Sequence, residues 1–393
     1  MTMLTDVRPA PGAHVARRGP SAWRHLDLVL IVAVLLVSAF GVVMVWSTTR
    51  VPLEAAGQSG LYVAKKQAEY TVVGVGVMLA VAAVDYRRYR DWAWLLYAGT
   101  VLLLVAVFGV GHRVSGSQAW FQIGPYQFEP AELAKMALAV CLAAYAAHFR
   151  GRLPARAAGV ILALTVVPFV LVYKQPALGS ALVLLAIAAV VIVVGGARGR
   201  LLAALAAAAV VTVVAVVELG VLKGYQKLRI TSFLRTPNNV SARFLQTPAG
   251  ASIFNIVRSK EAIAHGGLLG QGIGHGSATN LSQVPAQSTD FIFSAVGEQV
   301  GLVGCAALLA LFLVVIWRTW QAAALSRDVF GRLVCAGVLG YFVFEIFENI
   351  GMTMGLMPVA GIPLPWMSYG GSALLIEFAC VGLVLNVRMR RFS

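Results

Sequence analysis

The sequence predicts an all-α, polytopic membrane helix bundle of about ten transmembrane helices with one long extracytoplasmic loop. The first observation is composition: 59% of the 393 residues are hydrophobic and only 12% are charged, a balance far too apolar for an ordinary soluble domain. The second is the recurrence of apolar stretches of about 17 to 25 residues, the length that crosses a hydrocarbon core of roughly 30 Å as a helix. The third is the gathering of arginines in alternate connections between these stretches.

Ten apolar stretches are predicted to span the membrane. They cover residues 28–47, 70–85, 92–110, 131–148, 157–173, 178–194, 201–222, 290–317, 329–350 and 367–387. The stretch 178–194 is short, and the one from 290 is expected to begin as a partly interfacial helix, so nine spans is the alternative. Ten spans agree better with the charges, because they place the arginine-rich connections on one side.

Residues 1–26 are predicted to form a cytoplasmic N-terminal tail, and residues 27–393 a single membrane domain. The tail carries three arginines near the first span and no small-residue cleavage site follows that span, which predicts an anchor rather than a cleavable signal. The segments predicted to share the side of this tail contain Arg87, Arg88, Arg90, Arg150, Arg152, Arg156, Arg198, Arg200, Arg318, Arg327, Arg388, Arg390 and Arg391. The positive-inside rule therefore places both termini in the cytoplasm of a multi-pass cell-membrane protein.

The formal net charge is +15, which in a soluble protein would indicate a nucleic-acid partner. Here the arginines of the inner connections account for most of it, so no nucleic-acid binding is predicted. Cys141, Cys305, Cys335 and Cys380 lie within apolar stretches without metal-ligand spacing. They are predicted to be small packing residues rather than a disulfide framework.

Residues 223–289 form the long extracytoplasmic loop, and a loop of this length in a compact protein is usually functional. It is basic, with Arg229, Arg258 and Lys260 among its cations against a single acid, which suggests an anionic partner. Its glycine-rich segment 266–276 permits backbone amides to approach a phosphate. No nucleotide-binding fingerprint accompanies these glycines, so loop flexibility is the alternative interpretation.

Acids near the predicted spans are candidates for chemistry. Asp290 lies where the long loop meets the apolar run of the eighth span. A carboxylate there is costly unless it is paired, hydrated or used, so its position indicates chemistry on a lipid-borne substrate. Glu132 and Lys135, three residues apart at the start of the fourth span, either pair with each other or line a polar cavity. The deeper acids are Glu345, Glu348 and Glu377. They either form a transport or proton path or make hydrogen bonds between helices, and the sequence favours neither interpretation.

Four motifs occur in order between the predicted spans. They are YQKLRITSF (225–233), SKEAIAHGGLLGQGIGHG (259–276), TDFIFSAVGEQVGLVG (289–304) and NIGMTMGLMPVAGIPLPWMSYGGSA (349–373). Together they resemble the SEDS family of shape, elongation, division and sporulation proteins, from about residue 28 to the C-terminus. The final motif, with PVAGIPLP before SYGGS, is more similar to the rod-shape branch, RodA, than to the division branch, FtsW.

The resemblance implies a ten-span peptidoglycan glycosyltransferase that polymerises lipid II, an undecaprenyl-pyrophosphate-linked disaccharide peptide, at the outer face of the cell membrane. It implies a role in cell-wall elongation and cell-shape maintenance. Expected partners are a class B penicillin-binding protein transpeptidase and other proteins of the elongation or division complex. The acid of the TDF motif is the family's essential residue, which is Asp290 here. The alternatives are a lipid II flippase and a non-catalytic scaffold of the cell-wall synthesis complex.

Glycan polymerisation needs a base that takes the proton of the attacking 4-hydroxyl. Asp290 is the candidate, and such a base is worth about 10²- to 10⁴-fold in rate; metal coordination is its alternative role. The leaving pyrophosphate needs positive charge, from cationic side chains or from a divalent cation such as Mg²⁺ or Mn²⁺, and no other cofactor is predicted. The candidate substrate-binding residues are Glu132, Lys135, Arg229, Arg258, Lys260, Glu298, Ser368 and Tyr369.

Three of these candidates have a structural alternative. Glu298 follows Asp290 by eight residues, about two helical turns, and either supports Asp290 or caps internal polar contacts. Ser368 and Tyr369 match the family's last outer loop, where prolines and glycines redirect the backbone. For them a structural role comes first and cavity lining second.

Several polar positions of the family are changed in this chain. Ala119 replaces an Arg, Ala131 a Ser, Ala177 an Asp, Ala286 a Glu and Gln299 a second Glu, while Glu129 stands where Gln is usual. The lost Arg and Asp are compatible with the loss of one paired contact. The same changes are compatible with a weakened enzyme or a catalytically silent relative, and the retained Asp290 favours activity.

Overall fold

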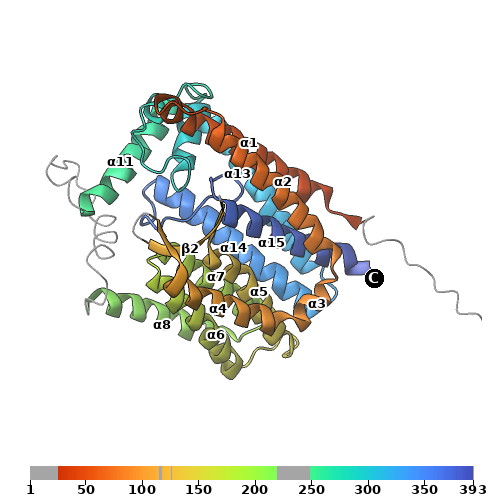
Figure 1. Cartoon of the computed structure of the whole chain (residues 1–393). Helices are drawn as coiled ribbons and strands as arrows, with labels where there is room; N and C mark the ends of the chain where they lie inside the picture. Colours follow the sequence, from red (N-terminus) through yellow and green to blue (C-terminus); the bar gives the residue numbers. More distant parts are fainter. Residues whose placement is uncertain (1–24, 115–116, 125, 219–247, 393) are drawn as a thin grey trace, which may run out of the picture.

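The computed structural model describes residues 25–114, 117–124, 126–218 and 248–392. Most of the predicted N-terminal tail and Arg229 lie outside these residues. Helices make up most of the described chain (Figure 1), which confirms the predicted all-α, polytopic bundle. They are α1 (Leu28–Ala55), α2 (Tyr62–Ala83), α3 (Tyr86–Asp91), α4 (Ala93–Val110), α5 (Pro130–Ala147), α6 (Ala155–Lys174), α7 (Leu178–Val194), α8 (Gly199–Glu218), α11 (Pro248–Gly266), α12 (Ser277–Asn280), α13 (Ile292–Ala324), α14 (Val329–Thr353) and α15 (Gly371–Met389), before a last 3-10 turn, Arg390–Phe392.

Seven helices in the described part of the chain are long and apolar enough to cross a membrane: α1, α4, α5, α6, α13, α14 and α15. The helix α7, with 17 residues, and the apolar part of α8 are shorter. The helix α2 has 22 residues, but charged side chains interrupt its first two turns. Ten spans are therefore not confirmed, and that number remains a prediction.

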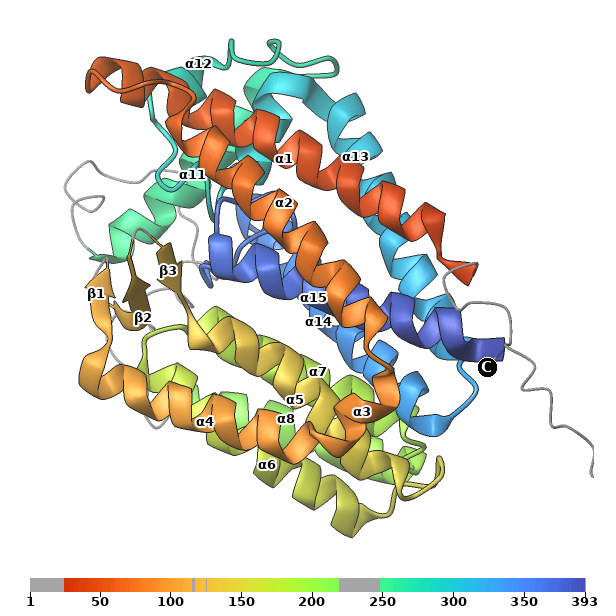
Figure 2. The ribbon, with the colours of Figure 1, turned by 45° about the vertical axis from the view of Figure 1, so that its right-hand side comes forward.

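A small antiparallel sheet interrupts the helices between α4 and α5, where the sequence predicts only a connection between spans. Its strands are β1 (His112–Val114), β2 (Ser117–Ile123) and β3 (Tyr126–Phe128), in the order β1-β2-β3. The sheet lies at one end of the bundle, beside the end of α4 and the start of α5 (Figure 2). The strands β1 and β3 have three residues each, too few for hydrophobic alternation to reveal them. The seven residues of β2, SQAWFQI, are long enough but do not alternate.

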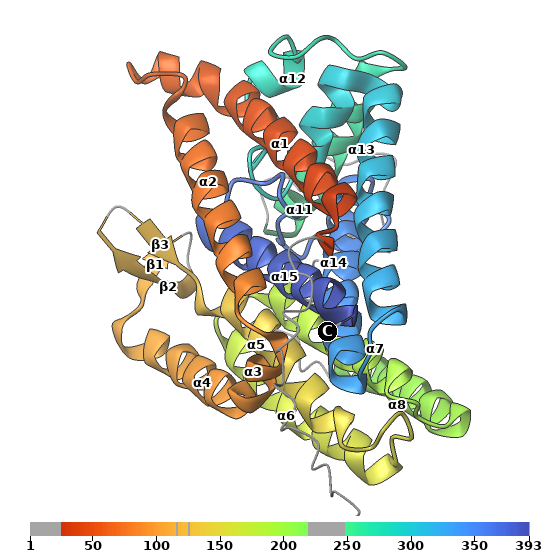
Figure 3. The same cartoon turned by 90° about the vertical axis from the view of Figure 1, so that its right-hand side faces the viewer.

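Two helices, α5 and α15, form the centre of the bundle. In their most apolar windows 83% and 89% of the residues are buried, against 22% in α4 and 28% in α13, so the latter two present most of their surface outward. The helix α15 packs along α2, with α14 on its other side (Figure 3). Glycines allow the approach of α2 and α15: a Cβ at Gly74 would lie 2.4 Å from Phe378, and one at Gly382 would lie 2.5 Å from the Met78 carbonyl.

The glycine-rich segment 266–276 packs against a kink in α13. Gly301, at φ +65°, breaks the helix, and a Cβ there would lie 2.4 Å from the Gly270 nitrogen. The amides of Leu302 and Val303 donate to carbonyls of this segment at 3.0 and 3.1 Å. These glycines therefore permit close packing of backbone on backbone. The predicted long loop is also partly helical, since it includes α11 and α12.

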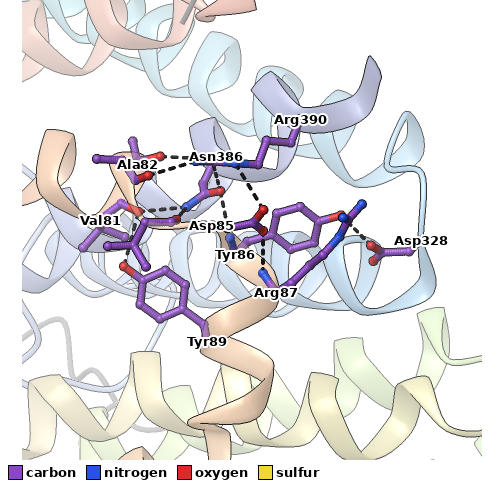
Figure 4. Close-up of polar contacts among 11 residues, drawn as sticks. Val81, Ala82, Asp85, Tyr86, Arg87, Tyr89, Asp328, Asn386 and Arg390 are labelled. Atoms are coloured by element: carbon purple, nitrogen blue, oxygen red, sulfur yellow. Dashed lines mark hydrogen bonds and ion pairs between the residues drawn. The ribbon is translucent and has the colours of Figure 1, made fainter. Parts of the chain in front are cut away.

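Polar contacts fasten the bundle at the end where α15 finishes. Asn386 accepts from the Tyr86 amide at 3.0 Å and donates to the Val81 carbonyl at 2.8 Å, while the Tyr86 hydroxyl donates to Asp328 (Figure 4). Asp328 also caps α14 by accepting from the Gly331 amide at 2.7 Å. One network therefore joins α2, α3, α14 and α15 at this end of the molecule.

Candidate functional site

A cavity of about 610 Å³ lies at the opposite end of α15. Its lining combines side chains from segments far apart in the sequence. The carboxylic acids are Glu129, Glu132 and Asp290, the aromatic residues are Tyr70, Trp120 and Tyr369, and the hydroxyl groups include Ser180, Thr289 and Ser372. A concave site that gathers several acids and hydroxyls is the principal candidate for chemistry.

Three helices begin at this cavity. The helices α5, α7 and α15 start directly after Glu129, Ala177 and Gly370, all of which line it. None of these three N-caps makes a side-chain capping hydrogen bond. Because the N-terminus of a helix carries roughly half a positive charge and unpaired amides, the three helix starts together favour an anionic group in the cavity.

Asp290 is partly buried and lines the cavity just before α13. Its backbone carbonyl accepts from Asn349 Nδ2 at 2.9 Å, and the same amide group donates to the Ile362 carbonyl at 2.8 Å. Gly361 has a φ of +71°, and a Cβ there would lie 3.4 Å from Asp290 Oδ2. The Asp290 carboxylate therefore faces the Gly361 backbone, at van der Waals distance from the place a Cβ would take.

The TDF and SYGGS motifs meet at this site. Ser368 Oγ donates to the Thr289 carbonyl at 2.6 Å and accepts from the Leu364 amide at 2.8 Å. The Tyr369 amide donates to the Ser288 carbonyl at 2.8 Å, and its side chain lines the cavity. Ser368 is buried and is not among the lining residues, so its contacts hold the backbone next to Asp290.

Lys135 is buried between two acids. Its Nζ lies 2.6 Å from Glu132 Oε1 and 2.6 Å from Glu345 Oε1, and it has no exposed surface. Glu132 both pairs with Lys135 and lines the cavity. Pairing and cavity lining were the two alternatives for Glu132 and Lys135. Glu132 does both, whereas Lys135 does not line the cavity. Among the other deep acids, Glu377 accepts from the Trp366 amide at 2.7 Å.

The cationic candidates of the long loop lie elsewhere. Arg258 is on α11, where it pairs with Glu261 at 2.8 Å and lies over Phe254. Lys260, on the same helix, is exposed, and Arg229 lies outside the described residues. In the part of the chain that the structure describes, no arginine or lysine is among the residues lining the cavity. The substrate-binding roles of these three residues remain predictions.

Glu298 binds the start of α12 and does not line the cavity. Its carboxylate accepts from the amides of Ala278 and Thr279 at 2.6 and 3.0 Å and from the Ser277 hydroxyl at 3.2 Å. It is fully buried and is not among the residues that line the cavity. These contacts match the capping alternative for Glu298, because they hold the first turn of α12. Gln299 beside it accepts from the Gly274 amide at 2.9 Å.

Four of the changed family positions line the cavity: Ala119, Glu129, Ala177 and Ala286. The positions of the lost Arg and the lost Asp, Ala119 and Ala177, therefore face one space. Their common location is consistent with the loss of a paired contact, since removal of both partners leaves no unpaired charge behind.

Glu129 is the site residue that the sequence analysis did not select. Burial is the largest cause that raises its pKa, to about 8, and the negative charge of Glu132 adds to the rise. Lys135 and a hydrogen bond from Trp120 act in the opposite direction, and Asp290 adds a smaller upward effect. Its signal in the sequence is an acid directly before the proline that starts a helix.

A divalent cation would find few protein ligands here. The described residues contain no group of three or more His, Cys, Asp or Glu side chains placed to hold a metal. Glu129 and Asp290 are two carboxylates of one cavity, and Mg²⁺ is often bound by one or two carboxylates together with substrate phosphates. The residues thus fit a cation held jointly with a substrate, and the metal requirement remains a prediction.

The fold and the cavity define a polytopic membrane protein with an acid-lined site at one end of its helix bundle. The family model of the FtsW, RodA and SpoVE cell cycle proteins matches residues 27–392. The chain belongs to this family, which confirms the predicted membership.

Relatives from several branches match at similar identity. Peptidoglycan glycosyltransferase MrdB of Escherichia coli is 32% identical over 367 residues, 93% of this chain and 94% of that protein. A probable peptidoglycan glycosyltransferase FtsW of Trichlorobacter lovleyi is 33% identical, with 94% and 95% covered. Stage V sporulation protein E of Bacillus subtilis is 33% identical, with 92% and 96% covered. A closer likeness to the RodA branch therefore remains a prediction.

Solved structures agree with this assignment. A chain from the work "Structural coordination of polymerization and crosslinking by a peptidoglycan synthase complex" matches with a TM-score of 0.76 and 31% identity, covering 94% of this chain and 99% of that one. The rod shape determining protein RodA of Thermus thermophilus matches with a TM-score of 0.67 and 29% identity, with the same coverage.

Proposed function

We propose that this chain, a peptidoglycan glycosyltransferase of cell-wall synthesis, polymerises lipid II in the cavity, with Asp290 as the general base. The observation that carries the proposal is the placement of the Asp290 carboxylate at a cavity where three uncapped helix N-termini converge. A sugar joined to a lipid pyrophosphate supplies both groups that such a cavity suits, an acceptor hydroxyl and a leaving anion.

The reaction is a displacement at the anomeric carbon of the donor sugar. The oxygen of the acceptor 4-hydroxyl forms a bond to that carbon, and the hydroxyl proton passes to Asp290. The bond from the same carbon to the pyrophosphate oxygen breaks, and the electron pair leaves with the lipid pyrophosphate. Attack from the face opposite the leaving group inverts the anomeric centre.

The reaction also requires stabilisation of the negative charge on the leaving pyrophosphate. No cationic side chain lines the cavity among the described residues, so the helix starts are the fixed positive groups that face it. Preorganised dipoles aimed at developing charge act strongly in a site that excludes water. This arrangement supports a larger role for α5, α7 and α15 than for Arg258 or Lys260 in stabilising the pyrophosphate.

The family relationships support the identity of the partner, and the distribution of arginines supports the orientation of the protein in the membrane. A related solved structure concerns a complex in which polymerization and crosslinking are coordinated, which supports a class B penicillin-binding protein as the transpeptidase partner. The arginine-rich connections support cytoplasmic termini and an extracytoplasmic cavity. Similarity to the rod shape determining protein RodA supports a role in elongation and cell shape, and identity to FtsW and Stage V sporulation protein E leaves division and sporulation as the alternatives.

The test is polymer formation by the purified protein. The full chain, alone and with its transpeptidase partner, is given lipid II in detergent, and the products are separated by size. Glycan strands are the expected result. Vesicles that contain the protein and labelled lipid II test the transport alternative in parallel. Headgroup movement across the bilayer without polymer would favour a flippase, and neither movement nor polymer would favour a scaffold.

A further inference from the structure

A second hollow, the α3–α5 pocket, lies at the other end of α5 from the cavity of Asp290. The helix α3 packs against α5 there (Figure 2). The pocket has a volume of about 450 Å³, within the range of roughly 300–1,000 Å³ that is usual for small-molecule sites. Its lining residues are Arg90, Asp91, Trp94, Ala144, Ala147 and His148. They come from the end of α3, the first turn of α4 and the last turn and C-cap of α5, and none of them lines the cavity of Asp290.

The length of α5 places this pocket at a membrane interface. The helix has 18 residues and is therefore about 27 Å long, close to the roughly 30 Å of a hydrocarbon core. Because α5 starts at the cavity of Asp290 and ends at the α3–α5 pocket, the two hollows lie at opposite interfaces. Trp92 and Trp94 are 45% and 50% exposed, as is typical of tryptophans at the level of the lipid headgroups. In the orientation proposed above, this interface is the cytoplasmic one.

The pocket combines a positive and a negative side chain. Arg90 Nε lies 3.9 Å from Asp91 Oδ1, and both side chains are more than half exposed. A contact of this length between exposed groups is weak, so both charges are available to a ligand. The guanidinium of Arg90 suits a phosphate group. The Asp91 carboxylate suits an ammonium group, and the C-terminus of α5 adds roughly half a negative charge.

Small residues of α5 keep the pocket open. Ala144 and Ala147, which line it from the last turn of the helix, carry only a methyl group. His148, the C-cap, is the other titratable residue of the lining, and its Nδ1 lies 3.1 Å from the Tyr145 carbonyl. A longer side chain at Ala147 would take the space of a bound group.

The outer face of α4 continues the pocket into the hydrocarbon region. Trp94 lines the pocket, and the next residue, Leu95, is 74% exposed. Leu102 follows seven residues later, on the same face of the helix, and is 70% exposed. Acyl chains that run along this face would cover both leucines. A ligand with acyl chains therefore gains apolar contacts that a soluble phosphate ester lacks.

We infer that the α3–α5 pocket binds the headgroup of a phosphatidylethanolamine molecule. The phosphate lies against Arg90, the ammonium group donates hydrogen bonds to Asp91, and the acyl chains lie along α4. The bound lipid joins the corner between α3 and α4 to the end of α5. This binding does not depend on the reaction in the cavity of Asp290.

The test compares the binding of three phospholipids with identical acyl chains to the full-length protein, purified in detergent and freed of native lipid. Native mass spectrometry measures the affinity for each. Phosphatidylethanolamine carries a phosphate and an ammonium group with N–H donors. Phosphatidylcholine has the same charges without N–H donors, and phosphatidylglycerol has the phosphate alone. Glycerophosphoethanolamine presents the headgroup without acyl chains.

Four variants locate the site. Arg90→Gln and Asp91→Asn each remove one charge of the pocket, and Ala147→Phe fills it. Arg88→Gln is the matched control, because Arg88 is an exposed arginine of the same helix that does not line the pocket. The two charge variants alter exposed side chains, so both should unfold at the wild-type temperature in detergent without phospholipid.

We expect the wild type to bind phosphatidylethanolamine about fivefold more tightly than either other lipid, the upper end for a contact between exposed charges. Asp91→Asn should abolish the preference over phosphatidylcholine, because the N–H donors lose their charged acceptor. Arg90→Gln should weaken all three lipids by about fivefold, since each has a phosphate. Ala147→Phe should weaken all three as well, and Arg88→Gln should match the wild type.

Equal affinity of the wild type for phosphatidylethanolamine and phosphatidylcholine would overturn the inference. A preference between these two lipids that persists in Asp91→Asn would do the same. Tighter binding of phosphatidylglycerol would show a site for anionic lipid instead. Glycerophosphoethanolamine that binds as tightly as the intact lipid would show a site for a soluble phosphate ester, which is equally contrary to the inference.

Discussion

The side-chain amide of Asn349 donates a hydrogen bond of 2.9 Å to the backbone carbonyl of Asp290. The same amide holds the Ile362 carbonyl at 2.8 Å, so one residue of α14 sets the separation of two segments beside the cavity. The position of the proposed base thus depends on a buried amide that does not itself line the cavity.

Asn349→Ala should lower the polymerisation rate by about 10- to 100-fold, because a misplacement of about 1 Å near reacting groups costs that much. The change should act mainly on kcat, since the substrate contacts remain. Initial rates at saturating and limiting lipid II measure this split. A rate equal to wild type in a correctly folded variant would show that Asp290 is positioned by other contacts.

Gly361→Ala should reduce activity because the added methyl group would occupy cavity space in van der Waals contact with the Asp290 carboxylate. The added Cβ would lie 3.4 Å from Asp290 Oδ2, and the φ of +71° disfavours any side chain there by roughly 1–2 kcal/mol. Gly267→Ala is the matched control, because Gly267 has a φ of +55° and open space around its Cβ position. Both variants should lose similar stability in thermal unfolding, and only Gly361→Ala should lose activity per folded molecule. Equal losses of activity in the two variants would show that backbone strain, and not the contact with Asp290, causes the loss.

Lys135→Met should destabilise the protein by about 3–5 kcal/mol, because it leaves two buried acids without their cation. Combining it with Glu345→Gln removes one of those charges and should recover part of the loss. Thermal unfolding of the two single variants and the double variant in detergent measures the coupling. If the loss of stability in the double variant equalled the sum of the losses in the two single variants, Lys135 and Glu345 would not belong to one buried network.

Asn386→Ala should weaken the opposite end of the bundle without affecting the site. It leaves the buried Tyr86 amide without its partner, which costs about 1–3 kcal/mol. Thermal unfolding should shift downward, while activity per folded molecule stays at the wild-type value. Asp91→Asn, which alters an exposed pair of 3.9 Å, should change neither quantity. Loss of activity in folded Asn386→Ala would show that the two ends of α15 are coupled.

The sequence predicts the helix bundle well because hydrophobic stretches are a local property of the chain. It also predicts the boundary position of Asp290, since a loop meets an apolar run there. The number of spans is harder to predict because α2 begins with charged residues and α7 is short. Short strands such as β1 and β3 leave no periodic signal at all.

The composition of the site could not be read from local patterns. Glu129, Ser180 and Ser372 come together with Asp290 only through the packing of α5, α7 and α15. The basic residues of the long loop suggest an anion site, yet Arg258 pairs with an acid of its own helix. A motif identifies such residues, and only the fold decides which of them face the cavity.

The most direct measurement is lipid II polymerisation by Asp290→Asn beside the wild type, each purified with the same transpeptidase partner. Asparagine keeps the size of the side chain but cannot accept the proton of the 4-hydroxyl. We predict a loss of about 10²-fold or more in rate, with an unchanged unfolding temperature. Polymer formed by Asp290→Asn at the wild-type rate would contradict the assignment of Asp290 as the general base.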